Sequence, residues 1–146
     1  MPETDVAVER LEDQLNWYDK KSSQNQRMFK RLKTATIVIS VSIPLSAAFV
    51  RQYPIVTGAL GALIALLEAL QQLNQYQQNW ITYRSTAEAL KHEKFLFLST
   101  AGPYAAADNP KALLAERVES LVSQEHAKWA SSQEQTAKAK EASVGR

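Results

Sequence analysis

The chain has 146 residues, a length typical of one domain, and its formal net charge of +2 is too small to predict a nucleic-acid partner. It contains no cysteine, which excludes disulfides and cysteine-based metal sites. The mean hydropathy of −0.30 resembles that of a soluble protein, but the average hides one apolar quarter, residues 34–70, between two polar flanks. We expect no signal peptide, because residues 1–33 lack an apolar core and carry acidic residues early.

Residues 1–33 are expected to form an amphipathic helix on the cytoplasmic side of a membrane. Their apolar side chains recur at spacings of three and four, which is the repeat of one helical face. Basic residues then crowd the approach to the apolar quarter, and by the positive-inside rule they indicate a cytoplasmic flank. The alternative is an ordinary solvated face. The membrane-flanking residues of this prediction are Arg27, Lys30, Arg31 and Lys33.

The first apolar run, residues 34–50, carries no charge and is the first predicted transmembrane helix. Its length is close to the ~20 residues that a span needs, once a few neighbours are added. Pro44 lies in its middle, which a membrane helix tolerates when other groups satisfy the freed carbonyl. Several Ser and Thr hydroxyls can bond back to the same helix or across to another.

The link between the two apolar runs is short, residues 51–54, and forces them to be antiparallel. Both chain termini are therefore expected on the side of the basic cluster. Tyr53 suits the opposite membrane interface, where aromatic rings are enriched, and Arg51 is the only charge in the link. The predicted topology is that of a multi-pass protein with both termini in the cytoplasm.

The second apolar run, residues 55–70, is rich in small residues and is the second predicted transmembrane helix. Small residues spaced four apart let helix backbones approach closely, within the hairpin or between subunits. The alternative is that Gly and Ala are simply common in membrane helices. The residues of this predicted packing face are Gly58, Ala62 and Ala65.

A polar stripe follows the second helix at 100° per residue and predicts a pore lining. Its members are Thr57, Gly61, Glu68, Gln72, Gln75 and Asn79, and it extends to Thr82 and Thr86. An ionisable group such as Glu68 is costly in lipid, and a ring of acidic side chains from several subunits would favour cations. The alternative is that Glu68 lies at headgroup level and pairs with Lys33 or Arg31.

The second helix has no stop signal after residue 70 and is expected to continue into the cytoplasm to about residue 98. Gly102-Pro103 breaks it, and Asn109 with Pro110 then caps a last helix over residues 109–130. Residues 131–146 are expected to be a flexible tail. The predicted fold is therefore all-α: one domain with a two-helix transmembrane hairpin and a cytoplasmic helical bundle, assembled as an oligomer.

Several motifs around the hairpin together resemble the SLATT superfamily of bacterial two-transmembrane proteins, and in particular its stand-alone members of unknown function. The likeness covers about residues 8–130 and includes W-x-x-Y-R, E-K-x-x-F and G-P-Y downstream of the hairpin. The segments that carry it are LEDQLNWYDKKS (11–22), QRMFKRLK (26–33), LLEALQQLNQYQQNWITYRSTAEALKHEKFLF (66–97), AGPY (101–104) and ERVESLVSQEHAKW (116–129).

The resemblance implies a bacterial inner-membrane protein with a cytoplasmic helical region, and it supplies no catalytic residues. Members joined to nucleotide-signalling or ligand-sensing domains are proposed to be pore-forming effectors in antiviral defence. We expect no fused sensor in this chain, which leaves open a channel with another trigger.

No enzyme signature, cofactor motif or metal-ligand spacing is present, and His92 and His126 predict no site. We therefore expect a homo-oligomeric channel or pore whose partners are the lipid bilayer, ions and further copies of the chain, with no nucleic acid. The first alternative is a membrane-anchored helical scaffold or interaction module. A weaker one is a soluble helical domain with the hairpin buried as its core.

Overall fold

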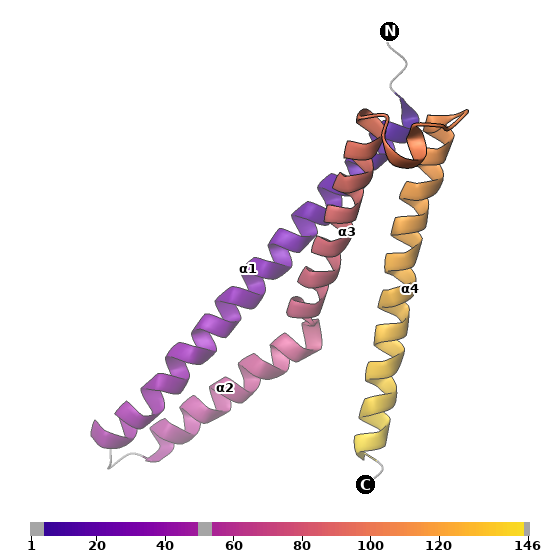
Figure 1. Cartoon of the computed structure of the whole chain (residues 1–146). Helices are drawn as coiled ribbons and strands as arrows, with labels where there is room; N and C mark the ends of the chain where they lie inside the picture. Colours follow the sequence, from indigo (N-terminus) through magenta and orange to yellow (C-terminus); the bar gives the residue numbers. More distant parts are fainter. Residues whose placement is uncertain (1–4, 50–53, 145–146) are drawn as a thin grey trace. The chain divides into compact units, whose positions relative to one another are not determined.

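The fold is all-α, as predicted, in every part of the chain that the structure describes. A computed structural model describes residues 5–49 and 54–144, without the side chains of residues 136 and 139–144. Figure 1 shows the order of the elements along the chain. They are α1 (Val6–Phe49), α2 (Pro54–Asn74), α3 (Tyr76–Leu98), the 3-10 turn η1 (Gly102–Tyr104) and α4 (Pro110–Val144). The link residues Arg51 and Tyr53 lie outside the described part of the chain.

Helix α1 joins the predicted amphipathic helix and the first apolar run into one helix of 44 residues. Pro44 lies inside this helix without ending it. The neighbouring hydroxyls bond back to the same helix. The Thr36 hydroxyl donates to the Leu32 carbonyl at 3.1 Å, and the Ser40 hydroxyl donates to the Thr36 carbonyl at 2.7 Å. These bonds satisfy the hydroxyls without a second helix.

The predicted continuous helix over residues 55–98 is divided at Gln75, which corrects the sequence-based expectation. Gln75 has a φ of +48°, so the backbone is left-handed at the point where α2 ends and α3 begins. Amides around the break compete for the backbone groups: Asn79 donates its Nδ2 to the Asn74 carbonyl at 3.0 Å. The Asn74 side chain donates to the Leu70 carbonyl at 2.9 Å. These contacts satisfy carbonyls near the end of α2.

The two boundaries after α3 agree with the sequence. Gly102, with a φ of +58°, begins η1, and the Asn109 side chain caps α4 by accepting the Ala112 N–H at 3.1 Å. The far end of α4 differs, because it continues as helix to Val144 where a flexible tail was expected. This segment consists mainly of good helix formers, and Lys138 pairs with Glu134 one turn earlier at 2.6 Å.

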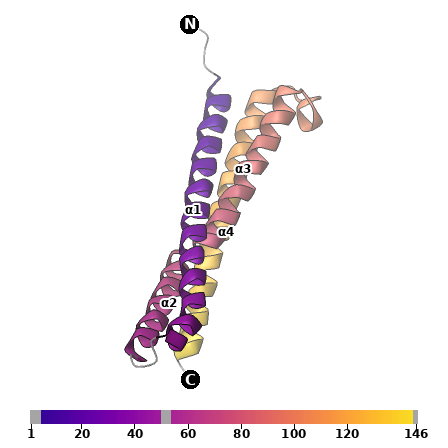
Figure 2. The ribbon, with the colours of Figure 1, turned by 90° about the vertical axis from the view of Figure 1, so that its left-hand side faces the viewer.

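The chain divides into two compact units. We call Lys20–Ile81 the hairpin unit, and Met1–Asp19 together with Thr82–Arg146 the bundle unit. In the hairpin unit, the second part of α1 lies beside α2, as Figures 1 and 2 show. The bundle unit has its own apolar core, to which α1, α3, η1 and α4 contribute. That core consists of Leu11, Tyr18, Ala87, Leu90, Tyr104, Leu114, Val118 and Val122.

Candidate functional site

The apolar segments of α1 and α2 are almost entirely open to the surroundings in the single chain. Two helical stretches, Val6–Phe49 and Pro54–Tyr104, are long and apolar enough to cross a membrane, and 6% of the most apolar window of each is buried. The core helix of a soluble protein would be mostly buried. The large side chains exposed here include Ile37, Val38, Val41, Leu45, Phe49, Ile55, Leu63 and Leu66.

An ion pair joins the two helices at the base of the hairpin. Lys33 Nζ lies 3.0 Å from Glu68 Oε1, and both side chains are nearly half exposed. Lys33 directly precedes the first apolar run, and Glu68 lies close to the end of the second. The contact therefore requires the antiparallel arrangement that the short link predicted. In the single chain Glu68 pairs with Lys33, which is one of the two interpretations that the sequence left open.

The other members of the polar stripe are distributed on both sides of the Gln75 break. Thr57 is half-buried, while Gly61 and Gln72 are exposed. Asn79 is half-buried, and its amide is engaged by the Asn74 carbonyl. Further along, Thr86 is buried in the bundle unit and donates to the Thr82 carbonyl at 3.2 Å. The stripe is thus continuous along α2 and is interrupted where the backbone turns left-handed.

The predicted packing face of α2 has no partner within the described chain. A Cβ built on Gly58 or on Gly61 would meet no atom within 4 Å, and Ala62 and Ala65 are exposed. The hairpin therefore does not use this face to bring its own two helices together. The sequence left open whether these residues pack within the hairpin or between subunits, and they do not pack within the hairpin.

Polar side chains are buried in the hairpin unit, which the sequence did not predict. Thr36 and Gln71 are both more than nine-tenths buried. The Gln71 Nε2 has no hydrogen-bond partner among the described residues, and leaving such a donor unsatisfied costs about 1–3 kcal/mol. Gln71 directly precedes Gln72 of the stripe, and the 100° step between them puts the two amides on different faces without indicating which face is buried. Only packing shows that Gln71 is the buried one.

Most of the membrane-flanking basic residues remain unpaired. Lys33 is held by Glu68, whereas Arg27, Lys30 and Arg31 are exposed and have no carboxylate within 4.0 Å among the described residues. The Arg27 Nε donates to the Ser23 carbonyl at 3.2 Å. This segment of α1 therefore presents concentrated positive charge to its surroundings.

The bundle unit holds two buried carboxylates that the sequence reasoning also missed. Glu93 accepts two bonds from the Arg117 guanidinium, at 2.6 and 2.8 Å, and a third from the Tyr104 hydroxyl at 2.7 Å. The Arg117 bonds hold the pKa of the Glu93 carboxyl below its usual value. Burial, together with Glu93, raises the pKa of Tyr104 to about 12. The carboxylate is thus saturated with donors and serves the structure of the bundle.

The second buried carboxylate, Glu125, accepts a bond from the Tyr18 hydroxyl at 3.0 Å. Burial, and next the charge of Glu125, raise the pKa of Tyr18. The rings of Trp17 and Tyr83 pack beside Tyr18. Part of this pattern was visible in the sequence, because Tyr83, Glu93 and Tyr104 belong to the W-x-x-Y-R, E-K-x-x-F and G-P-Y motifs. Each of these motifs thus supplies one side chain to a contact within the bundle unit.

A family model described as a protein of unknown function (DUF4231) matches residues 13–112, more than half of the chain. The match begins in α1, includes α2 and α3, and ends in the first turn of α4. It therefore covers the hairpin, the Gln75 break and the G-P-Y motif. No curated protein and no solved structure matches the chain.

Proposed function

The chain belongs to the DUF4231 family, whose function is unknown, and from its own residues we propose that it is a homo-oligomeric membrane channel that passes ions. In this proposal α2 lines the pore and the bundle unit lies in the cytoplasm. On the motifs around the hairpin, we further propose that this chain is a SLATT-like protein.

Membrane insertion is supported by the surface of the hairpin. Exposed side chains such as Val41, Phe49 and Ile55 are 60–86% accessible, and a contiguous apolar surface of this kind is unfavourable in water. Lipid tails would provide an apolar environment for this surface. By the positive-inside rule, the basic residues at the base of the hairpin support a cytoplasmic location for that end and for both termini. With the resemblance above, this supports the proposal of a multi-pass protein of the bacterial inner membrane.

The observation that carries the channel proposal is the unpartnered face of α2. Small residues let helices approach closely, and here Gly58 and Gly61 face open space within one chain. A second subunit would fill that space. The exposed Gln72 and the half-exposed Glu68 continue along the same helix toward the cytoplasm. An assembly that packs α2 helices together would bring these polar groups around one path, with cations favoured near Glu68.

The proposal predicts that Gly58→Leu disrupts the oligomer without unfolding the chain. Within one chain the new side chain has room, and Leu favours helix over Gly by about 0.8–1 kcal/mol. Ala59→Leu is the matched control, because Ala59 is also exposed and lies about 100° around the helix. Oligomer mass in detergent and currents across reconstituted liposomes are the measurements. We expect Gly58→Leu to reduce both and Ala59→Leu to retain both.

An absence of current from the wild-type chain under all voltages and salts would contradict the channel and favour the membrane-anchored scaffold. The scaffold makes a different prediction. Replacing residues 34–70 with an unrelated two-span anchor would preserve its function, and a protein partner would co-purify with the bundle unit.

A further inference from the structure

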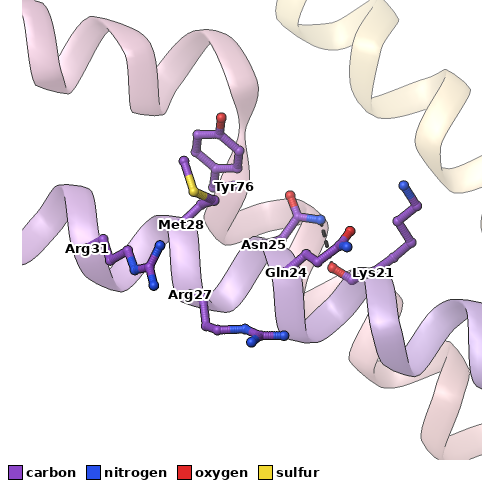
Figure 3. Close-up of a pocket in the computed structure, with 7 residues that line it drawn as sticks. All are labelled: Lys21, Gln24, Asn25, Arg27, Met28, Arg31 and Tyr76. Carbon is purple, nitrogen blue, oxygen red and sulfur yellow. Dashed lines mark hydrogen bonds between the residues drawn. The ribbon is translucent and has the colours of Figure 1, made fainter.

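A pocket opens in the hairpin unit between α1 and the start of α3, with a volume of about 510 Å³. Figure 3 shows that α1 supplies all but one of the lining side chains, and that Tyr76 stands where α2 gives way to α3. The break at Gln75 is what brings Tyr76 to this position, since α3 begins directly after the left-handed residue. We call this the interfacial pocket. Its volume is in the range of small-ligand sites.

Among the described residues, the lining is basic and contains no acid. Lys21, Arg27 and Arg31 contribute three positive charges, and two amide side chains add further polar groups. Arg31 and the terminal nitrogens of Arg27 make no hydrogen bond with any described residue. A guanidinium presents paired N–H donors that match the oxygens of a phosphate group. Met28 and Tyr76 supply an apolar part to the same wall.

The charge of the whole hairpin unit makes the pocket more selective for anions. Residues 20–81 contain seven Lys or Arg and a single acid, Glu68, which Lys33 already holds. The rest of the chain has ten Lys or Arg against fourteen Asp or Glu. The overall net charge of +2 thus combines a hairpin unit at +6 with a bundle unit at −4. No acid of the hairpin unit is left to neutralise the pocket.

The end of the pocket nearest the two apolar runs lies at, or just outside, the depth of phospholipid headgroups. On α1, Arg31 and Arg27 precede the apolar run by three and seven residues, which corresponds to about 5 and 10 Å of helix. On the other wall, Tyr76 follows Leu70 by six residues, or about 9 Å. The headgroup layer extends roughly 5–8 Å beyond the hydrocarbon on each side. The Arg31 backbone therefore lies within this layer, and the backbones of Arg27 and Tyr76 lie just beyond it, within reach of their own long side chains.

We propose that the interfacial pocket binds a phosphate group, and that the headgroup of an anionic phospholipid supplies it. Arg27 and Arg31 hold the phosphate oxygens, Lys21 adds charge at the outer edge, and Met28 and Tyr76 pack beside the headgroup. Any phosphate ester offers the same chemistry. The position of Arg31, three residues before the first apolar run, is what assigns the lipid as the source of the phosphate. The proposal rests on the membrane insertion proposed above and does not require that the protein conducts ions.

The test is native mass spectrometry of the full chain in detergent, titrated with phosphatidylglycerol or with phosphatidylcholine of the same acyl chains. We expect phosphatidylglycerol to bind at least tenfold more tightly. The variant Arg27→Gln/Arg31→Gln should lose at least about tenfold per arginine, on the order of 100-fold in total, because each guanidinium gives up charge-assisted hydrogen bonds to the phosphate. The control Lys20→Gln/Lys30→Gln removes the same charge from the same segment, outside the pocket, and should lose at most the roughly fivefold per charge of diffuse attraction. Tyr76→Ala should weaken binding with no change in charge.

Equal binding of the two lipids overturns the proposal, as does an equal loss in the two double variants, which would indicate diffuse surface attraction. A titration with glycerol 3-phosphate alone shows whether the bound phosphate group comes from a lipid headgroup or from a free phosphate ester. If it fills the pocket and phosphatidylglycerol does not compete, the lipid assignment is wrong. Recovery of each variant in the membrane fraction is measured in parallel. A wild-type chain that fails to insert refutes the membrane proposal itself, whereas one that inserts without lipid preference refutes only the pocket.

Discussion

At the scale of single residues, the Lys33–Glu68 pair sets the charge at the base of the hairpin. The two charges nearly cancel in the single chain, because they lie 3.0 Å apart. If the pair flanks a conducting path, removing the carboxylate makes the local charge more positive, and removing the ammonium makes it more negative. Glu68→Gln leaves the Lys33 cation unbalanced, and Lys33→Gln leaves the Glu68 carboxylate unbalanced.

We therefore predict that Glu68→Gln lowers the cation-to-anion permeability ratio of reconstituted channels and that Lys33→Gln raises it. The measurement is the reversal potential in asymmetric salt. Surface charges act over about 10 Å at 0.1 M salt, so both effects should shrink at 1 M. Unchanged reversal potentials in both variants would show that this pair is remote from the ion path.

The buried Glu93 is the residue on which we expect the bundle unit to depend most. Its carboxylate is 7% exposed and receives donors from Arg117 and Tyr104. Arg117→Met removes two of these bonds and leaves a buried charge, so we predict a loss of about 2–3 kcal/mol in the free energy of unfolding. The exposed Arg10–Glu119 pair is the control, and Arg10→Met should cost less than about 1 kcal/mol. Thermal unfolding of the full chain in detergent, followed by circular dichroism, measures both.

The same site sets a pH dependence with a defined sign. The pKa of Glu93 is lowered in the folded chain by the Arg117 bonds, so its ionised form stabilises the fold above the usual Glu pKa. This stabilisation is lost as the pH falls through the lowered value. The stability difference between wild type and Glu93→Gln should therefore be full at neutral pH and should shrink below about pH 4. A difference that stays constant to pH 2 would contradict this assignment.

At the scale of elements, a break between α2 and α3 and a continuous helix predict opposite effects of Gln75→Gly on the free energy of unfolding. Gln75 adopts a left-handed backbone, which disfavours residues with a Cβ by about 1–2 kcal/mol. Gln75→Gly should thus leave the stability unchanged or raise it by up to about 1 kcal/mol. Gln72→Gly, inside α2, should lower it by about 0.5–1 kcal/mol. The two unfolding curves, compared in the same detergent, decide between a break and a continuous helix.

The elements with strong local signals were predictable, and those without them were not. Gly102-Pro103 and Asn109 carry the chemistry of a break and a cap, and both were identified from the sequence. Gln75 carries no such signal, because Gln is a good helix former that rarely adopts a positive φ. The extension of α4 was also missed: the Ala-, Lys-, Gln- and Ser-rich residues after 130 were expected to be flexible, although most of them favour helix.

At the scale of the whole molecule, the sequence predicted the all-α class and the antiparallel hairpin, while the internal contacts of the bundle unit stayed hidden. The hairpin follows from two adjacent apolar runs and a four-residue link, which are local facts. The pairs Tyr18–Glu125 and Arg117–Glu93 depend on which helix faces which. Periodicity assigns residues to a face without naming the partner of that face.

The bundle core combines residues from distant parts of the chain, so during synthesis it can form only after the hairpin. Leu11 and Tyr18 share their core with Leu114 and Val122, about a hundred residues later in the chain. The hairpin, by contrast, needs nothing beyond Ile81. Translation proceeds from the N-terminus at about 5–20 residues per second, so the hairpin emerges several seconds before α4. During that interval the N-terminal part of α1 lacks its packing partner α4. The bundle core can form only after most of the chain has left the ribosome.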